Sequence, residues 1–227
     1  MASAFEREAR LLAHLKNPFL PGVIDYFYER SEQFLVMEFI PGEDLAAGLK
    51  NRKRPYAVSE VLGWTDQLFQ VLRYLHEQQP RIVHRDIKPQ NILIESSTGR
   101  PRIADFGLAK LTDEDMEMTR DGESLGTPPY MPPEQFKDAA HCTLRSDVYA
   151  LGATLYHTLS GRPPFQASTS LATMRQVLDQ EPVPLRQLNA AVDLELEILC
   201  MKCLEKEPAR RFQSAAELAD ELARYLK

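Results

Sequence analysis

The chain has 227 residues, of which 44% are hydrophobic and 26% are charged, a usage typical of a globular protein with a sizeable core. Its net charge of −6, without any basic stripe, argues against nucleic acid as a main partner. No apolar run reaches the ~18 residues of a membrane span, and the start lacks the apolar core of a secretory signal. Three cysteines cannot all pair, which favours a reducing compartment. We therefore expect a cytoplasmic protein, or the cytoplasmic part of a longer and membrane-anchored one.

The first fifth of the chain predicts one helix and one hairpin. Apolar residues recur at helical spacing over residues 4–16, and a proline-containing stretch follows. The runs 23–28 and 34–39 are rich in β-branched and aromatic residues and flank a polar stretch, which indicates a β-hairpin. Pro41-Gly42 then breaks the pattern, and we expect a short helix over residues 43–50.

The rest of the chain predicts mainly helices. Ser59 is a suitable N-cap for a helix whose buried face would hold Leu62, Leu68, Phe69, Leu72 and Leu75. Residues 110–135 show no period and carry several glycines and prolines, which is typical of a long functional loop. Helical patterns recur near residues 146–160, 171–180, 193–205 and 214–226. The order of elements predicts an α+β fold whose larger part is helical.

The run from residue 82 to residue 94 is the most informative part of the sequence. Asp86, Lys88 and Asn91 lie at fixed spacing between two apolar runs, as candidates for a base, a phosphate contact and a metal ligand. Nineteen positions after Asp86 comes Asp105, in the tripeptide Asp-Phe-Gly. This pair of motifs resembles the catalytic loop and the metal-binding turn of the protein kinase family.

The resemblance covers essentially the whole chain and implies a protein-kinase-like fold. Residues 1–40 would be a partial N-lobe, with helix C and the hairpin that leads to the hinge. Residues 41–227 would be a complete, mainly helical C-lobe with the catalytic and activation loops. The sequence departs from the family pattern because no Gly-x-Gly-x-x-Gly and no Val-Ala-Ile-Lys precede Asp86.

The resemblance implies roles in phosphoryl transfer for the four signature residues. Asp86 would accept the proton of the substrate hydroxyl, and Lys88 would offset the charge of the γ-phosphate. Asn91 and Asp105 would hold Mg²⁺, which prefers hard oxygen ligands. The implied cofactors are therefore ATP and Mg²⁺.

The same resemblance implies a nucleotide pocket. Lys88, Asn91 and Asp105 would contact its phosphate end. Its other residues would be a helix C glutamate, the gatekeeper, two hinge residues, a ribose contact and the adenine floor: Glu8, Met37, Glu38, Ile40, Asp44 and Leu93. Glu8 would pair with the lysine that this sequence lacks.

Two features indicate the substrate and the regulation that the resemblance implies. Lys88, two residues after Asp86, is typical of serine/threonine kinases, and Thr127 lies in a segment that resembles their substrate-docking segment. Arg85 would pair with a phosphorylated residue of the activation loop, and we expect autophosphorylation within residues 112–127, with Thr119 and Ser124 as candidates.

Further residues have structural roles in this interpretation. Glu134 would form a buried pair with Arg211, and Asp147 would hold the backbone of the catalytic loop. Cys200 and Cys203 form a Cys-x-x-Cys without a second pair, so we expect core cysteines and no zinc site. The histidines at positions 14, 76, 141 and 157 show no ligand spacing and are expected to be structural.

The sequence favours a serine/threonine protein kinase that transfers the γ-phosphate of ATP to a serine or threonine hydroxyl of a protein. The alternative is a non-catalytic pseudokinase or interaction module that genuinely starts at Met1. A small-molecule kinase is disfavoured by residues 126–134, which resemble a platform for protein substrates. We expect the isolated chain to be weakly active or inactive, and its unpaired strand edge to favour aggregation.

Overall fold

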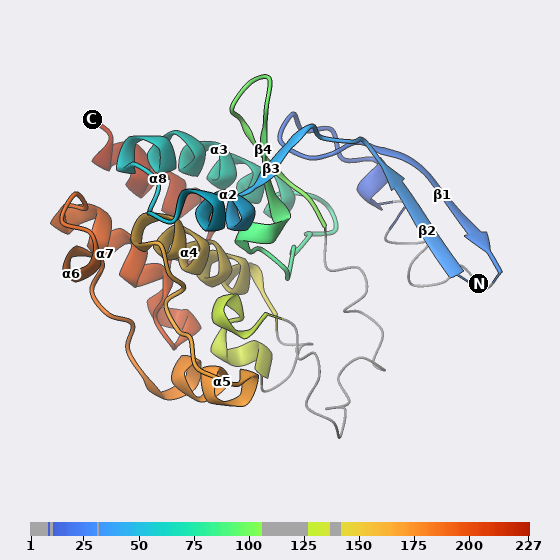
Figure 1. Ribbon diagram of the computed structural model, residues 1–227. Coiled ribbons are helices and arrows are strands. Elements are labelled where there is room, and N and C mark those ends of the chain that lie inside the picture. Colours follow the sequence, from blue (N-terminus) through green and yellow to red (C-terminus); the bar gives the residue numbers. More distant parts are fainter. Residues whose placement is uncertain (1–8, 10, 31, 106–126, 137–141) are drawn as a thin grey trace.

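The computed structural model describes residues 9, 11–30, 32–105, 127–136 and 142–227 (Figure 1). Of the expected helix over residues 4–16, the structure describes residue 9 and residues 11–16. Residue 9 and residues 11–13 are helical, with Ala9 and Leu12 buried, and the helix ends at residue 13, three residues earlier than expected.

The predicted hairpin is present as β1 (Val23–Glu29) and β2 (Glu32–Met37), which pair antiparallel in a sheet of their own. Its second strand begins and ends two residues earlier than the sequence pattern indicates. Figure 1 shows the hairpin extending away from the helical body. Several of its large apolar side chains are therefore exposed, and Phe27 and Phe34 stack on each other with ring centroids 5.2 Å apart.

A second sheet joins the end of the hairpin region to the helical body. Its strand order is β3 (Gly42–Asp44), β4 (Ile92–Glu95) and β5 (Pro101–Ile103), all antiparallel. The helix expected from residue 43 therefore begins later, as α2 (Leu45–Arg52), because β3 pairs with β4 up to Asp44. Asp44 then caps α2, since its Oδ1 accepts a hydrogen bond of 2.8 Å from the amide of Ala47.

The next helix, α3 (Val58–His76), begins one residue before Ser59, so the prediction of Ser59 as its N-cap is wrong. Ala57 occupies that position, and the carboxylate of Glu60 accepts a hydrogen bond of 2.9 Å from its amide. The glutamate thus satisfies the helix start where the capping residue itself cannot. The predicted apolar face of α3 lies in the core, although Leu62 is only partly buried.

The remaining helices form the body of the molecule around a central buried helix, α4 (Leu144–Ser160). Thr143 caps its start, and Gly161 ends it in the left-handed conformation with φ 78°. A Cβ atom added at Gly152 would lie 2.4 Å from the Cβ of Cys203, so this glycine permits the close packing of a neighbouring helix.

Four predicted helices correspond to α4, α5 (Ser170–Asp179), α7 (Leu194–Cys203) and α8 (Ala215–Tyr225). The short α6 (Leu185–Leu188) was not expected. The described residues also include short 3-10 helices: η1 (Pro89–Asn91), η4 (Pro128–Tyr130) and η5 (Pro133–Phe136) precede α4, and η7 (Pro208–Arg210) lies between α7 and α8. Cys200 and Cys203 are fully buried on α7, as core cysteines should be.

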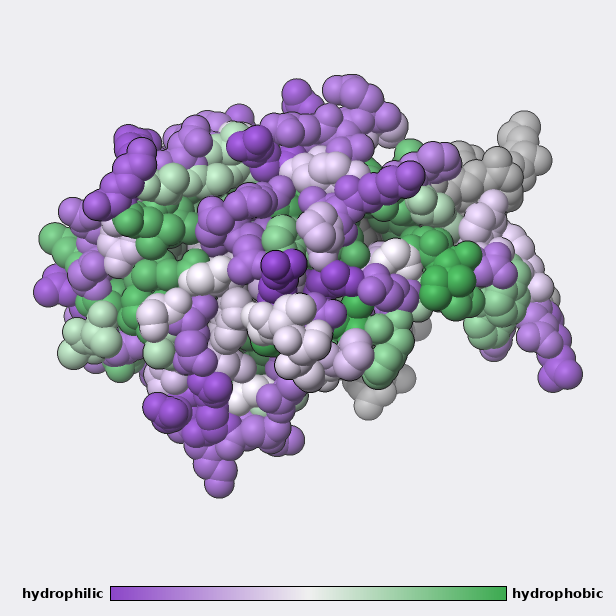
Figure 2. Space-filling model, turned by 90° about the horizontal axis from the view of Figure 1, so that it is seen from above, coloured by the Kyte–Doolittle hydropathy of each residue, from purple (hydrophilic) through white to green (hydrophobic). Residues whose placement is uncertain are grey.

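The mixed architecture with a helical larger part confirms the predicted fold class. In the described part of the chain, no helix has both the length and the apolar character needed to cross a membrane. Figure 2 shows apolar side chains at two places on this face, on the helical body and on the side from which the hairpin extends.

Candidate active site

The loop between α3 and β4 brings three of the predicted catalytic residues into contact. Oδ2 of Asp86 lies 2.8 Å from Nζ of Lys88 and accepts a hydrogen bond of 2.9 Å from Nδ2 of Asn91. Nδ2 of Asn91 also donates to the backbone carbonyl of Asp86 at 2.9 Å. Only 16% of the Asp86 side chain and 19% of the Lys88 side chain are exposed, so both charged groups are held in a fixed arrangement.

Asp105, the fourth residue, lies next to this cluster at the end of β5. Nδ2 of Asn91 lies 3.4 Å from the Asp105 carbonyl, and the amide of Ala104 donates to the Asn91 carbonyl at 2.8 Å. The amide nitrogen of Asn91 therefore faces the protein, which leaves its Oδ1 for another ligand. The Asp105 side chain is exposed, and its carboxylate has no hydrogen bond or ion pair to the described residues.

Oδ1 of Asn91 and the carboxylate of Asp105 fit a magnesium ion as ligands. Mg²⁺ is usually bound through one or two protein oxygens, with the other positions taken by water and substrate phosphates. The described residues contain no group of three or more His, Cys, Asp or Glu that could hold a metal by itself. Asn91 and Asp105 would thus be sufficient only together with a phosphate-bearing ligand.

Two residues of the site have strained backbones. Arg85 has φ 67° and Asp105 has φ 54°, in the left-handed region that residues other than glycine rarely occupy. Such conformations cost ~1–3 kcal/mol each and persist only where the surroundings enforce them.

Asp147 of α4 supplies that enforcement for Arg85. Its two carboxylate oxygens accept hydrogen bonds from the amides of His84 at 2.8 Å and Arg85 at 2.9 Å. The carboxylate is fully buried and also lies 3.0 Å from Nε2 of His76. Burial lowers the pKa of His84, although the neighbouring carboxylates of Asp147 and Asp86 oppose this shift. The structure thus places Asp147 where the sequence analysis expects it, but the contact with His76 has no sequence signal.

The short helix η4 contributes to the same site, because its residues and those of the catalytic loop line one pocket. A pocket beside Asp86 is lined by Arg85, Asp86, Ile87, Lys88, Thr127, Tyr130, Met131, Pro132, Gln135, Ser146, Asp147 and Ala150. Thr127 thus lines the same pocket as Asp86, and its part in substrate docking stays a prediction. Sequence reasoning missed the contact between the Tyr130 hydroxyl and Nδ1 of His157, at 2.6 Å, because the two residues come from separate elements. Burial raises the pKa of Tyr130 and lowers the pKa of His157 to about 4.

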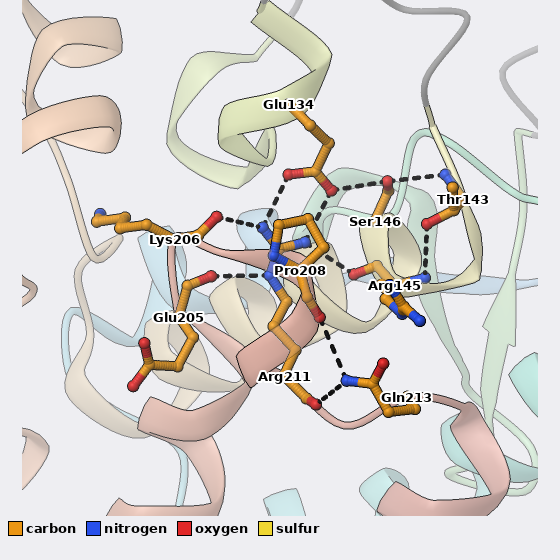
Figure 3. Close-up of polar contacts among 9 residues, drawn as sticks. All are labelled: Glu134, Thr143, Arg145, Ser146, Glu205, Lys206, Pro208, Arg211 and Gln213. Atoms are coloured by element: carbon orange, nitrogen blue, oxygen red, sulfur yellow. Dashed lines mark hydrogen bonds and ion pairs between the residues drawn. The ribbon is translucent and has the colours of Figure 1, made fainter.

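Glu134 and Arg211 form a bidentate ion pair below this segment (Figure 3), with both N–O distances at 2.8 Å. The Arg211 side chain is fully buried, and its other three N–H groups donate to backbone carbonyls of Arg145, Glu205 and Lys206. All five donors of the guanidinium are therefore used. Burial by itself would raise the pKa of Glu134, but the hydrogen bonds and charge of Arg211 outweigh it and lower that pKa.

The expected nucleotide contacts are partly assembled. Leu93 on β4 pairs in register with Asp44, so the expected adenine floor and ribose contact are neighbours. Met37 ends β2, and the side chain of Ile40 is buried. The Glu38 carboxylate is bound to Arg102 at 2.8 Å and its amide donates to the Gly22 carbonyl at 2.8 Å, so its carbonyl is the backbone group left for the hinge role. Glu8, Thr119 and Ser124 lie outside the described residues, so the expectations about them stay predictions.

Comparison with known proteins decides the family. The family model described as protein kinase domain matches residues 1–222. The chain belongs to the protein kinase domain family. It is similar to the serine/threonine-protein kinase pkn2 of Myxococcus xanthus, with 37% identity over 98% of this chain and 27% of the relative. Serine/threonine-protein kinase PknB of Mycobacterium leprae is 32% identical over 97% of this chain and 35% of its own length.

A solved structure supports the protein kinase fold. The crystal structure of Rad53 residues 1–466 in complex with AMP-PNP matches 97% of this chain and 54% of that chain, with a TM-score of 0.79 and 24% identity. The chain spans about a third or less of the two curated relatives' length.

Proposed function

We propose that this chain is the core of a serine/threonine protein kinase that transfers the γ-phosphate of ATP to a serine or threonine hydroxyl of a protein. The observation that carries the proposal is the Asp86 carboxylate, held by Lys88 and Asn91 in a pocket that Thr127 also lines. The names of the bacterial relatives support the same reaction class.

The geometry suggests how the residues divide the work. Asp86 orients the substrate hydroxyl and accepts its proton, since its carboxylate is fixed by two donors and faces the pocket. Lys88 shares this position and offsets negative charge on the transferred group. Asn91 Oδ1 and the Asp105 carboxylate hold Mg²⁺, which when bound neutralises charge on the phosphates.

Further parts of the proposal concern cofactor, regulation and location. ATP use is supported by the family and by the ATP analogue in the Rad53 complex. The Nε of Arg85 is buried without a hydrogen-bond partner among the described residues, which is consistent with a later contact to a phosphorylated residue within 112–127. We further propose a partial N-lobe over residues 1–40, a C-lobe over 41–227 and a cytoplasmic location.

The test combines nucleotide binding with phosphoryl transfer. Binding of ATP is measured by calorimetry with and without Mg²⁺, and transfer from radiolabelled ATP to the chain itself and to a generic protein substrate is followed in parallel. We expect Mg²⁺-dependent binding and slow transfer. Asp86→Asn should reduce transfer by about 10²–10⁴-fold and retain binding, because it removes the base and no nucleotide contact.

The matched control is Asp220→Asn, which changes an exposed carboxylate on α8 in the same way. It should leave both measurements unchanged. Transfer that survives Asp86→Asn would contradict the assigned base. Absence of both binding and transfer would instead favour the non-catalytic interaction module.

A further inference from the structure

The expected nucleotide site is assembled from two separate parts of the molecule. The hinge residues 38–40 follow the hairpin, whereas Leu93 and Asp105 belong to the sheet at the helical body. Figure 1 shows the hairpin standing away from that body. Its position relative to Leu93 and Asp105 therefore depends on a few contacts near its base.

Arg102 makes the central contacts of this kind. It lies on β5, three residues before Asp105, and 13% of its side chain is exposed. One terminal nitrogen donates to the Pro18 carbonyl at 2.5 Å, and the other donates to Oε2 of Glu38 at 2.8 Å. The guanidinium thus binds Pro18, in the segment before the hairpin, and Glu38, the first residue after it.

Neighbouring bonds make this contact rigid. The Glu38 carboxylate also accepts the amide of Gly22 at 3.2 Å, and the Glu38 amide donates to the Gly22 carbonyl at 2.8 Å. These bonds close the base of the hairpin. Next to Arg102, the amide of Ile103 donates to the Phe19 carbonyl at 3.0 Å, so the main chain of β5 is attached to the same segment.

The register of the sheet places this contact at the expected nucleotide site. Arg102 pairs with Leu93 across β4 and β5, and Leu93 pairs with Asp44 across β3 and β4. Arg102 is therefore on the strand that leads to the metal ligand and opposite the adenine floor. Its side chain reaches the first residue of the hinge.

We propose that Arg102 is a positioning residue for the nucleotide, a role that rests on the proposed function. By holding Glu38, it fixes the hinge backbone relative to Leu93 and Asp105. The hinge that would contact the base of ATP then keeps a fixed position relative to the residues that would hold its phosphates and the metal. Misplacement by ~1 Å is sufficient to lower the efficiency of such a site by about 10²-fold.

The chemistry of the side chain is specific to arginine. Its two terminal nitrogens bind acceptors on two different segments, and a planar guanidinium can reach both at once. A lysine carries its charge and its donors on one nitrogen, so it would have to reach both acceptors from a single point. Nε of Arg102 is buried without a partner among the described residues, so the hydrogen bonds of this side chain come from its two terminal nitrogens.

The test measures the dissociation constant of Mg²⁺–AMP-PNP by calorimetry, together with the melting temperature without nucleotide. Arg102→Met removes both hydrogen bonds and retains the apolar stem, Arg102→Lys retains the charge, and Glu38→Gln weakens the acceptor. The control is Arg100→Met, an exposed residue immediately before β5. We expect Arg102→Met to raise the dissociation constant by about tenfold or more, Arg102→Lys to raise it less, and Arg100→Met to leave it unchanged.

A double-mutant cycle separates positioning from a general loss of stability. If Arg102 acts through Glu38, Arg102→Met should have a smaller effect on nucleotide affinity in the Glu38→Gln background than in the wild type. Fully additive effects, or a folded Arg102→Met protein that binds as tightly as the wild type, would overturn the inference. If Arg102→Met does not fold, the dissociation constants of Arg102→Lys and Glu38→Gln test the inference, and wild-type affinity in both would overturn it. Failure of the wild type itself to bind would count against the proposed function instead.

Discussion

His157 shows how a single residue at the candidate site depends on its surroundings. Its Nδ1 lies 2.6 Å from the Tyr130 hydroxyl, and the two rings stack with centroids 6.0 Å apart. Burial lowers the pKa of His157 from 6.5 to about 4, so the imidazole is neutral near pH 7. A neutral ring can accept the hydroxyl hydrogen and hold Tyr130 of η4, which lines the pocket beside Asp86.

This residue predicts a specific pH dependence of stability. The unfolded chain binds a proton at His157 near pH 6.5 and the folded chain only near pH 4, so its contribution is complete above pH 6.5 and decreases below it. Relative to the wild type, His157→Gln should lose less unfolding free energy between pH 6.5 and 4 in urea titrations. The exposed His14→Gln serves as control, and equal slopes for His157→Gln and wild type would contradict the prediction.

Among the elements, η5 and the loop after η7 are joined by the ion pair of Glu134 and Arg211 (Figure 3). Ser146 in the first turn of α4 donates to the same carboxylate at 2.9 Å. The pair therefore fixes the segment that follows Thr127 against the buried helix. Because all five donors of Arg211 are used, removal of Glu134 leaves a buried guanidinium with part of its hydrogen bonds unmade.

Glu134→Ala should accordingly lower the melting temperature. Breaking a buried ion pair by removing one partner costs ~3–5 kcal/mol, whereas an exposed pair contributes ~0–1 kcal/mol. Glu207→Ala is the matched control, because Glu207 pairs with Arg210 at 3.4 Å with both side chains about two-thirds exposed. Thermal unfolding of both variants gives the comparison, and equal melting temperatures would remove the structural role of Glu134.

At the scale of the whole molecule, the body and the hairpin differ in how much they bury. Most residues of α4 are buried, and α3, α7 and α8 surround the same core. The hairpin buries little, and Ile24 and Phe39 near its base are 70% and 83% exposed. Burial of apolar surface supplies most of the free energy of folding, so the two parts should differ in local stability.

Hydrogen exchange should reveal this difference. We expect the amides of α4 to exchange only through global unfolding, and those of β1 and β2 to exchange much faster through local opening. Peptide-resolved exchange followed by mass spectrometry over minutes to hours measures both regions in one sample. Protection of the hairpin equal to that of α4 would mean that the two unfold as one cooperative unit.

The sequence by itself determined the features that depend on neighbouring residues. The spacing of Asp86, Lys88 and Asn91 is local, so the cluster could be predicted before any fold was known. Composition likewise predicted the hairpin, and apolar patterns predicted α3 and four further helices of the body. Predictions at element ends were weaker: Ser59 is not the N-cap of α3, and residue 43 belongs to a strand. Pairing with a distant strand and a cap from Glu60 decided those ends.

The tertiary structure alone decided the contacts between residues far apart in the chain. His76 meets Asp147 across 71 positions, Glu38 meets Arg102 across 64, and Tyr130 meets His157 across 27. The pair of Glu134 and Arg211, 77 positions apart, was expected only from the family resemblance. Sequence periodicity reports which face of an element is buried, but not which element covers it. These contacts therefore depend on how helices and strands pack, which is settled only when the whole core forms.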